Sequence, residues 1–192
     1  MNRAPAPALA LALALALLCC GLASADEAAN YERAAKYSEA KRGSSLLVMK
    51  GGKVVFERYA AGRTAEAATE IYSGTKSFWG VAVMVAVGEG KLSLDELASD
   101  TLKEWKGDPR KAKITLRQLL DLTSGLDPAA RKLRSPRTTR KYETALALEA
   151  TSDPGQVYRY GPSHFYALGE LLKRKLGVSP LAYLKEKILD PI

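Results

Sequence analysis

The hydrophobic pattern first sets an N-terminal apolar run apart from the rest of the chain. Residues 8–18 are an uninterrupted Ala/Leu stretch, Arg3 precedes it, and Ala23-Ser24-Ala25 follows it. A positive start, a short apolar run and a small-residue site are typical of a cleaved secretory signal. The run is shorter than the roughly 20 residues that a membrane-spanning helix needs. We therefore expect residues 1–25 to be a signal peptide, with no stable membrane insertion after cleavage, and residues 26–192 to form one periplasmic or secreted domain.

The next clear pattern is that of a β-hairpin. Residues 45–50 and 53–59 are two strand-like runs, separated by Gly51-Gly52, a pair that suits a tight turn. A helix is expected before them, over residues 28–41. Because two strands alone do not form a stable sheet, this hairpin needs further strands or a covering helix.

The rest of the chain shows helical patterns. Residues 73–87 are apolar nearly all round, which predicts a helix in the middle of the domain that ends at Gly88-Glu89-Gly90. Leucines at helical spacing predict a second helix over residues 115–122. A third helix is expected between Ser163 and Gly177, and Ser179-Pro180 is a strong start signal for a last one.

Composition and charge exclude several classes of site. Both cysteines fall within residues 1–25, and His164 is the single histidine of the 192 residues, so we expect no disulfide, no metal site and no cofactor. The formal net charge is +8, with basic clusters in residues 103–113 and 131–141. A nucleic-acid site would need stacking aromatics interleaved with the basic residues or a known reader motif, and Tyr142 at the edge of the second cluster does not provide this, so no nucleic-acid partner is expected. They are interpreted as a solvated surface or as a contact for an anionic cell-envelope polymer.

Candidate chemistry begins at Ser73-Gly74-Thr75-Lys76. Positions i and i+3 share one face of a helix, so the Lys76 amine can lie beside the Ser73 hydroxyl. A serine hydroxyl needs such a partner to become a good nucleophile, and a lysine among apolar neighbours can serve as a base. The helix N-terminus would also favour an oxyanion. A Ser-x-x-Lys tetrapeptide also occurs by chance, and the alternative interpretation is a surface lysine whose stem covers apolar residues.

A second stretch makes the pattern specific. Residues 154–169 read Pro-Gly-Gln-Val-Tyr-Arg-Tyr-Gly-Pro-Ser-His-Phe-Tyr-Ala-Leu-Gly, and residues 90–95 and 114–126 carry further matching segments. From about Ser45 onward, the chain resembles the family of class C β-lactamases, D-alanyl-D-alanine carboxypeptidases and related esterases, in which a Ser-x-x-Lys helix is followed by a Tyr-x-Asn loop. The resemblance implies an α/β (α+β) fold of the β-lactamase/transpeptidase type, with an antiparallel sheet flanked by helices and a helical subdomain.

The same resemblance implies roles for individual residues. Ser73 would be acylated, Lys76 would help to take its proton, and Tyr160 would share the role of base and proton shuttle. The backbone amide of Ser73 would supply half of an oxyanion hole. The implied activity is that of an exported serine hydrolase acting through an acyl-enzyme, and the implied substrate is a small molecule or peptide: an ester, a D-amino-acid peptide or a β-lactam.

Two departures from the family pattern affect this interpretation. Pro162 occupies the usual Asn position and cannot donate a hydrogen bond to a substrate amide, which favours esters or small amides. No Lys-Thr-Gly or His-x-Gly strand follows, so we expect the sequence to be truncated at its C-terminus and to lack the third active-site element.

Other interpretations stay open. A Ser-His-Asp hydrolase would need His164 as its base, but no Gly-x-Ser-x-Gly is present, and we expect His164 to be a surface or capping residue. Tyr158 and Tyr166 are expected to be core or interface aromatics, and Trp79 a core residue. A catalytically inert cell-wall-binding relative of the same fold, or a basic envelope-polymer-binding protein, are the alternatives to an enzyme.

Overall fold

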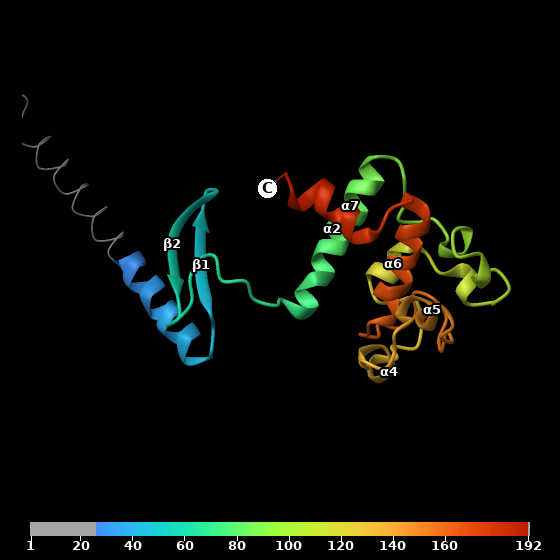
Figure 1. The fold of residues 1–192 in the computed structure, drawn as a ribbon, viewed down its shortest axis with the longest axis horizontal. Helices are drawn as coiled ribbons and strands as arrows, with labels where there is room; N and C mark the ends of the chain where they lie inside the picture. The colour runs from blue at the N-terminus through green and yellow to red at the C-terminus, as the bar shows by residue number, and fades with distance from the viewer. Residues whose placement is uncertain (1–25, 192) are drawn as a thin grey trace, which may run out of the picture. The chain divides into compact units, whose positions relative to one another are not determined.

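The computed structural model describes residues 26–191, so the expected signal peptide, residues 1–25, lies outside the described part. The described residues fall into two compact units, divided between Glu70 and Ile71. The first carries a two-stranded sheet, and the second is helical (Figure 1). Within residues 26–191, no helix is long and apolar enough to cross a bilayer.

The first unit contains a helix over residues 26–40 and the strands β1 (Ser45–Lys50) and β2 (Lys53–Tyr59). The strands pair antiparallel, and a bulge falls between Val48 and Met49. Gly51 and Gly52 have φ values of 56° and 76°, positive as a tight hairpin turn requires. The predicted hairpin is therefore confirmed.

The N-terminal helix supplies the cover that the hairpin needs. Arg58 of β2 forms ion pairs with Glu32 at 2.7 Å and with Glu39 at 3.2 Å. The rings of Tyr31 and Phe56 lie 5.6 Å apart. The helix thus packs against one face of the sheet, which a hairpin alone could not bury.

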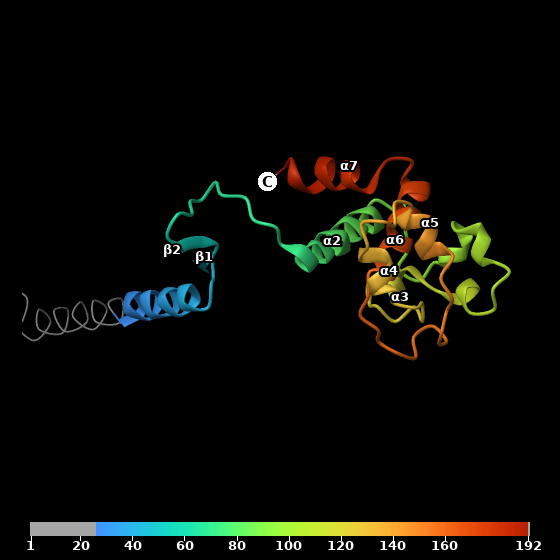
Figure 2. The same ribbon diagram turned by 60° about the horizontal axis from the view of Figure 1, so that its bottom comes forward.

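The second unit is built from helices around one core. Its helices are α2 (Thr75–Gly88), α3 (Leu116–Leu120), α4 (Ala130–Arg134), α5 (Lys141–Leu146), α6 (Ser163–Leu176) and α7 (Pro180–Leu184). Shorter turns are η1 (Tyr72–Gly74), η2 (Ala98–Asp100), η3 (Lys103–Trp105), η4 (Lys111–Lys113) and the π-helical η5 (Lys185–Leu189). Helix α6 packs against α3, α5 and α7, and Figure 2 shows α7 beside α2. The buried Trp105 donates its indole N–H to the Leu146 carbonyl at 3.0 Å.

Local end signals correctly predicted both ends of α6 and the start of α7. Helix α6 begins at Ser163 and ends before Gly177, whose φ is 72°. Ser179 accepts a hydrogen bond from the Ala182 amide at 3.1 Å and caps α7. Helix α3 ends at Leu120, two residues earlier than predicted, and Leu122 then has a left-handed φ of 61°, which a continuing helix could not contain.

Helix α2 differs from its prediction in two ways. It was expected to be buried all round, but only its face of small residues, Ala82, Val83 and Ala86, is buried. Val81 and Met84, on other sides of the helix, are 49% and 52% exposed, because no other element of the second unit covers them. The expected helix start at Ser73 is instead the 3₁₀ turn η1, so the α-helix proper begins at Thr75.

Candidate active site

Ser73 lies in the turn η1, which leads directly into α2. The residue before it, Tyr72, has a φ of 46°, a left-handed conformation that costs a non-glycine residue of order 1–3 kcal/mol. The amide of Gly74 donates to the carbonyl of Ile71 at 2.9 Å and closes the turn. The serine is thereby exposed at the N-terminal end of α2, where the first backbone amides have no partner within the helix.

The structure brings the three predicted polar residues together. Lys76 Nζ donates to Ser73 Oγ at 3.2 Å and to Tyr160 Oη at 3.1 Å. The first contact follows from the i, i+3 spacing along one turn, whereas the second joins residues 84 positions apart in the sequence. The Lys76 amine also lies 4.9 Å from the Tyr160 ring centroid and 5.6 Å from that of Phe165. One amine therefore bridges the serine hydroxyl and the phenol.

The surroundings of Tyr160 favour its ionised form. Hydrogen bonds from Ser73 and then from Lys76 lower the pKa of the phenol, and the positive charges of Lys76 and Arg134 act in the same direction. Desolvation opposes this shift, with an effect smaller than that of either hydrogen bond but larger than that of either charge. The surroundings of Tyr160 thus favour loss of its phenolic proton.

The loop that carries Tyr160 is held by a close backbone approach. Gly161 is buried, and a Cβ added to it would lie 2.5 Å from Pro128 Cβ and 2.7 Å from Pro128 Cα. Pro162 follows as the N-cap of α6, and its carbonyl accepts the Tyr166 amide at 3.0 Å. Pro162 also lines the pocket described below, so this position offers an apolar ring and no donor.

We predict that Gly161→Ala destabilises the protein by about 1–3 kcal/mol, because the added methyl group overpacks against Pro128. Gly80→Ala is the matched control. Gly80 lies inside α2 with no atom within 4 Å of an added Cβ, so alanine there is expected to stabilise by up to about 1 kcal/mol. Urea unfolding of both variants measures the difference. Equal effects would show that the contact with Pro128 does not constrain the loop.

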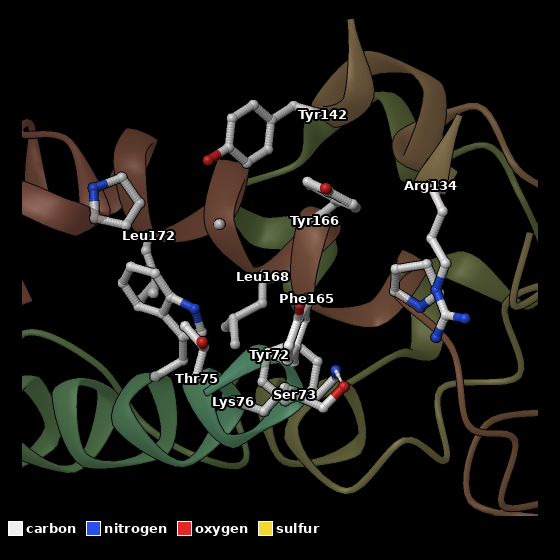
Figure 3. A pocket seen from close by; sticks show the side chains of 14 residues that line it. Tyr72, Ser73, Thr75, Lys76, Arg134, Tyr142, Phe165, Tyr166, Leu168 and Leu172 are labelled. Carbon is white, nitrogen blue, oxygen red and sulfur yellow. Dashed lines mark hydrogen bonds between the residues drawn. The ribbon is translucent and has the colours of Figure 1, made fainter. Parts of the chain in front are cut away.

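A pocket of about 740 Å³ opens beside Ser73 and Lys76 (Figure 3). Helices α2 and α6 form much of its wall, and Arg134 of α4 and Tyr142 of α5 also line it. Most of the lining is apolar or aromatic: Tyr72, Trp79, Tyr142, Pro162, Phe165, Tyr166, Leu168, Leu172 and Pro180. Within the described residues, no cluster of three or more His, Cys, Asp or Glu side chains could hold a metal ion.

The pocket places two aromatic residues differently from their predictions. Trp79 is only partly buried and lines the pocket, and so does Tyr166, whose ring meets that of Tyr142 edge-on at 5.8 Å. Tyr158, expected in a core or interface, is 63% exposed within the described part of the chain. Neither Arg134 nor Tyr142 was predicted to be near the site, and no local signal marks them, since only the packing of α4 and α5 brings them there.

His164 is neither a surface residue nor a helix cap, contrary to the prediction. Its side chain is fully buried and hydrogen-bonded to the equally buried Ser124 at 2.8 Å. The partner lies 40 residues earlier, so nothing in the local sequence indicates this contact. Burial lowers the pKa of the imidazole, because the charged form loses hydration.

We expect this buried histidine to make stability depend on pH. The unfolded chain takes up a proton near pH 6.5, whereas the folded chain, with its lowered His164 pKa, resists protonation until the pH is lower. Stability should therefore fall as the pH drops from 7 through 6.5 towards the folded-state pKa, by up to about 1.4 kcal/mol per pH unit. Urea unfolding at pH 7.5, 6.0 and 5.0 tests this. A wild-type stability that stays flat across this range would contradict the prediction.

His164→Gln is the control for this pH dependence, since it removes the titrating group and should flatten the curve between pH 7.5 and 5.0. Carboxylates with lowered pKa values make stability depend on pH mainly at lower pH. The pKa of Glu89, for example, is lowered to about 2 by hydrogen bonds from Lys91 and Tyr183, so the stabilisation that it contributes is lost as the pH falls from its ordinary value of 4.5 towards 2.

Comparison with known proteins places the chain in a family. The Beta-lactamase family model matches residues 28–192. "Protein flp" of Staphylococcus aureus (strain MW2) is 27% identical over 167 residues, which is 78% of this chain and 33% of the relative. "Acyltransferase mokF" of Monascus pilosus is 30% identical over 145 residues, which is 62% of this chain and 35% of the relative. The chain thus spans about a third of the length of these curated relatives.

A solved structure supports the fold. The octameric penicillin-binding protein homologue from Pyrococcus abyssi matches with a TM-score of 0.70 and 26% identity, over 85% of this chain and 42% of its own. The predicted β-lactamase/transpeptidase-like fold is therefore confirmed for the part that this chain covers, which is mainly helical with a small antiparallel sheet. The chain belongs to the Beta-lactamase family.

Proposed function

We propose that this chain belongs to a serine acyl-transfer enzyme in which Ser73 is acylated by an ester or a small amide. The observation that carries the proposal is the contact of one amine, Lys76 Nζ, with both Ser73 Oγ and Tyr160 Oη. A serine hydroxyl becomes nucleophilic when a neighbouring group accepts its proton. Tyr160, with its lowered pKa, is suited to that task, and Lys76 to stabilising the phenolate.

The proposed reaction runs in two halves. In the first, Ser73 Oγ bonds to the substrate carbonyl carbon while its proton passes to the Tyr160 oxygen. The tetrahedral intermediate then collapses, the bond to the leaving alcohol or amine breaks, and Tyr160 returns the proton to that group. In the second half, water attacks the acyl carbon and gives its proton to Tyr160, which passes it to the departing Ser73 oxygen.

The pocket suggests the class of acyl group. Its aromatic and aliphatic lining suits an apolar acyl chain or ring, since burying such a surface is favourable. Pro162 presents no donor for a peptide amide, so the proposed substrates are esters or small amides rather than extended peptides. Two relatives agree in chemical class: the curated acyltransferase from Monascus pilosus, and a solved hydrolase described as having promiscuous acyltransferase activity.

The test is covalent labelling of the full chain. The chain is incubated with a fluorophosphonate and, separately, with a penicillin, and its intact mass is measured. A single stoichiometric adduct, mapped to Ser73 by peptide mass analysis, is the expected result with the fluorophosphonate. Hydrolysis of a series of nitrophenyl esters with acyl chains of two to ten carbons then tests the apolar pocket, and kcat/KM should rise with chain length.

Two results would contradict the proposal. An adduct on a residue other than Ser73 would show that the site does not activate this serine. The absence of any adduct, together with saturable binding of cell-wall peptides, would favour the alternative of a catalytically inert binding relative.

A further inference from the structure

Two polar side chains, Ser124 and His164, are completely buried beside the loop that carries Tyr160. Burying a hydroxyl or an imidazole away from water is costly unless each polar atom has a hydrogen-bond partner. Both side chains meet this condition, and together they connect the end of the α3 region to the loop before α6.

The partners fix one tautomer of His164. Its Nε2 lies 2.8 Å from the carbonyl oxygen of Arg159, an atom that can only accept, so Nε2 carries the hydrogen. In the neutral ring Nδ1 then holds a lone pair and accepts the Ser124 hydroxyl hydrogen at 2.8 Å. The Ser124 oxygen in turn accepts the amide of Leu126 at 3.3 Å. In this hydrogen-bond network each donor group, the imidazole Nε2–H, the Ser124 hydroxyl and the Leu126 amide, has one acceptor.

The carbonyl oxygen of Arg159, at the end of this hydrogen-bond network, belongs to the peptide group that joins Arg159 to Tyr160. The Arg159 residue is held at both of its polar backbone groups, because its own amide donates to the Leu122 carbonyl at 3.0 Å. One residue further on, Tyr160 extends from this fixed peptide to place its hydroxyl 3.1 Å from Lys76 Nζ. A change in the orientation of the peptide would move that hydroxyl.

We propose that His164 is a positioning residue for Tyr160. By donating its Nε2–H to the Arg159 carbonyl, it keeps the Tyr160 hydroxyl within hydrogen-bond distance of Lys76 Nζ. Ser124 fixes the tautomer of His164 that can make this donation. This inference rests on the proposed role of Tyr160 as the base. His164 itself does not touch the reacting groups.

The first test uses the wild-type chain. Because His164 is the single histidine of the sequence, the imidazole signals in a long-range ¹⁵N–¹H NMR spectrum belong to it, and no variant is needed to assign them. A neutral ring with hydrogen on Nε2 at pH 7.5 is expected. A ring that carries hydrogen on Nδ1, or on both nitrogens, at this pH would overturn the proposal.

The second test compares two substitutions that each keep half of the network. The side-chain amide of Gln can occupy the position of Nε2, so it keeps a donor for the Arg159 carbonyl. The shorter side-chain amide of Asn can occupy the position of Nδ1, so it keeps a partner for the Ser124 hydroxyl. Each leaves one buried group unpaired, so His164→Gln and His164→Asn should lose similar stability. Only His164→Asn releases the Arg159 carbonyl.

The decisive readout is the pKa of Tyr160, followed by ¹³C NMR of labelled tyrosine rings with Tyr160→Phe for assignment. The charged groups that act on this phenol are Lys76 and Arg134, which neither variant changes. His164→Asn should raise the Tyr160 pKa towards its ordinary value and slow labelling of Ser73 by about 10- to 100-fold, whereas His164→Gln should rescue both. If both variants leave the Tyr160 pKa at the wild-type value, or both raise it equally, the positioning role is refuted.

This design separates the two proposals. A wild-type chain that resists labelling at Ser73 refutes the proposed function, yet the tautomer and the Tyr160 pKa can still be measured. If both His164 variants are labelled at the wild-type rate and keep the wild-type Tyr160 pKa, only the role of His164 is refuted.

Discussion

Ser73→Ala will abolish the fluorophosphonate adduct and lower ester turnover by roughly 10⁴- to 10⁶-fold. The reason is that Ser73 Oγ is the atom that Lys76 contacts at 3.2 Å and the atom proposed to bond to the acyl carbon. Without it, no covalent intermediate can form. Intact mass spectrometry measures the adduct, and steady-state kinetics with a nitrophenyl ester measures turnover.

Ser77→Ala is the matched control for this experiment. Ser77 is an exposed serine on the same helix, four residues later, and it is not among the residues that line the pocket. This variant should keep full labelling and full turnover. If Ser73→Ala retained the adduct, or if Ser77→Ala lost it, the assignment of the nucleophile would be wrong.

Tyr160→Phe should slow acylation of Ser73 by roughly 10²- to 10⁴-fold, the range typical of a lost general base. The ring and its packing remain, so the change removes only the hydroxyl that lies 3.1 Å from Lys76 Nζ. The wild-type rate of acylation should rise with pH through the lowered pKa of Tyr160, because the phenolate is the active form. The variant should lose this ascending limb. Stopped-flow labelling from pH 6 to 10 measures both.

Tyr158→Phe controls for the general effect of removing a phenol from this loop. Tyr158 lies two residues earlier and is 63% exposed, so its hydroxyl should not affect the rate. If the Tyr160→Phe variant reacts as fast as wild type, with an unchanged pH profile, then Lys76 and not Tyr160 is the base.

Local patterns predicted the elements whose ends depend on one or two residues. The hairpin follows from the pair Gly51-Gly52, and the start of α7 from Ser179 followed by proline. The proximity of Ser73 and Lys76 also follows from their spacing alone, since three residues make about one helical turn. In each case, the stabilising interaction lies within a few positions of the signal.

Features that depend on distant partners were not predictable in this way. The contact between Tyr160 and Lys76 was expected only through the family resemblance, because 84 residues separate the two. His164 was expected to be a surface or capping residue and is buried instead, and its partner Ser124 lies on another segment. The exposure of Val81 and Met84 depends on which elements pack against α2, and an apolar sequence cannot show which of its faces is covered.

The left-handed backbone of Tyr72 limits how far the proposed reactivity of Ser73 can be transferred to another protein. A short peptide with the sequence of η1 and α2 would reproduce the spacing of Ser73 and Lys76, but a free tyrosine rarely adopts a φ of 46°. The conformation must therefore be imposed by the rest of the folded chain. A Ser-x-x-Lys helix grafted onto another scaffold would present its serine at a different angle, so reactivity would not transfer with the tetrapeptide.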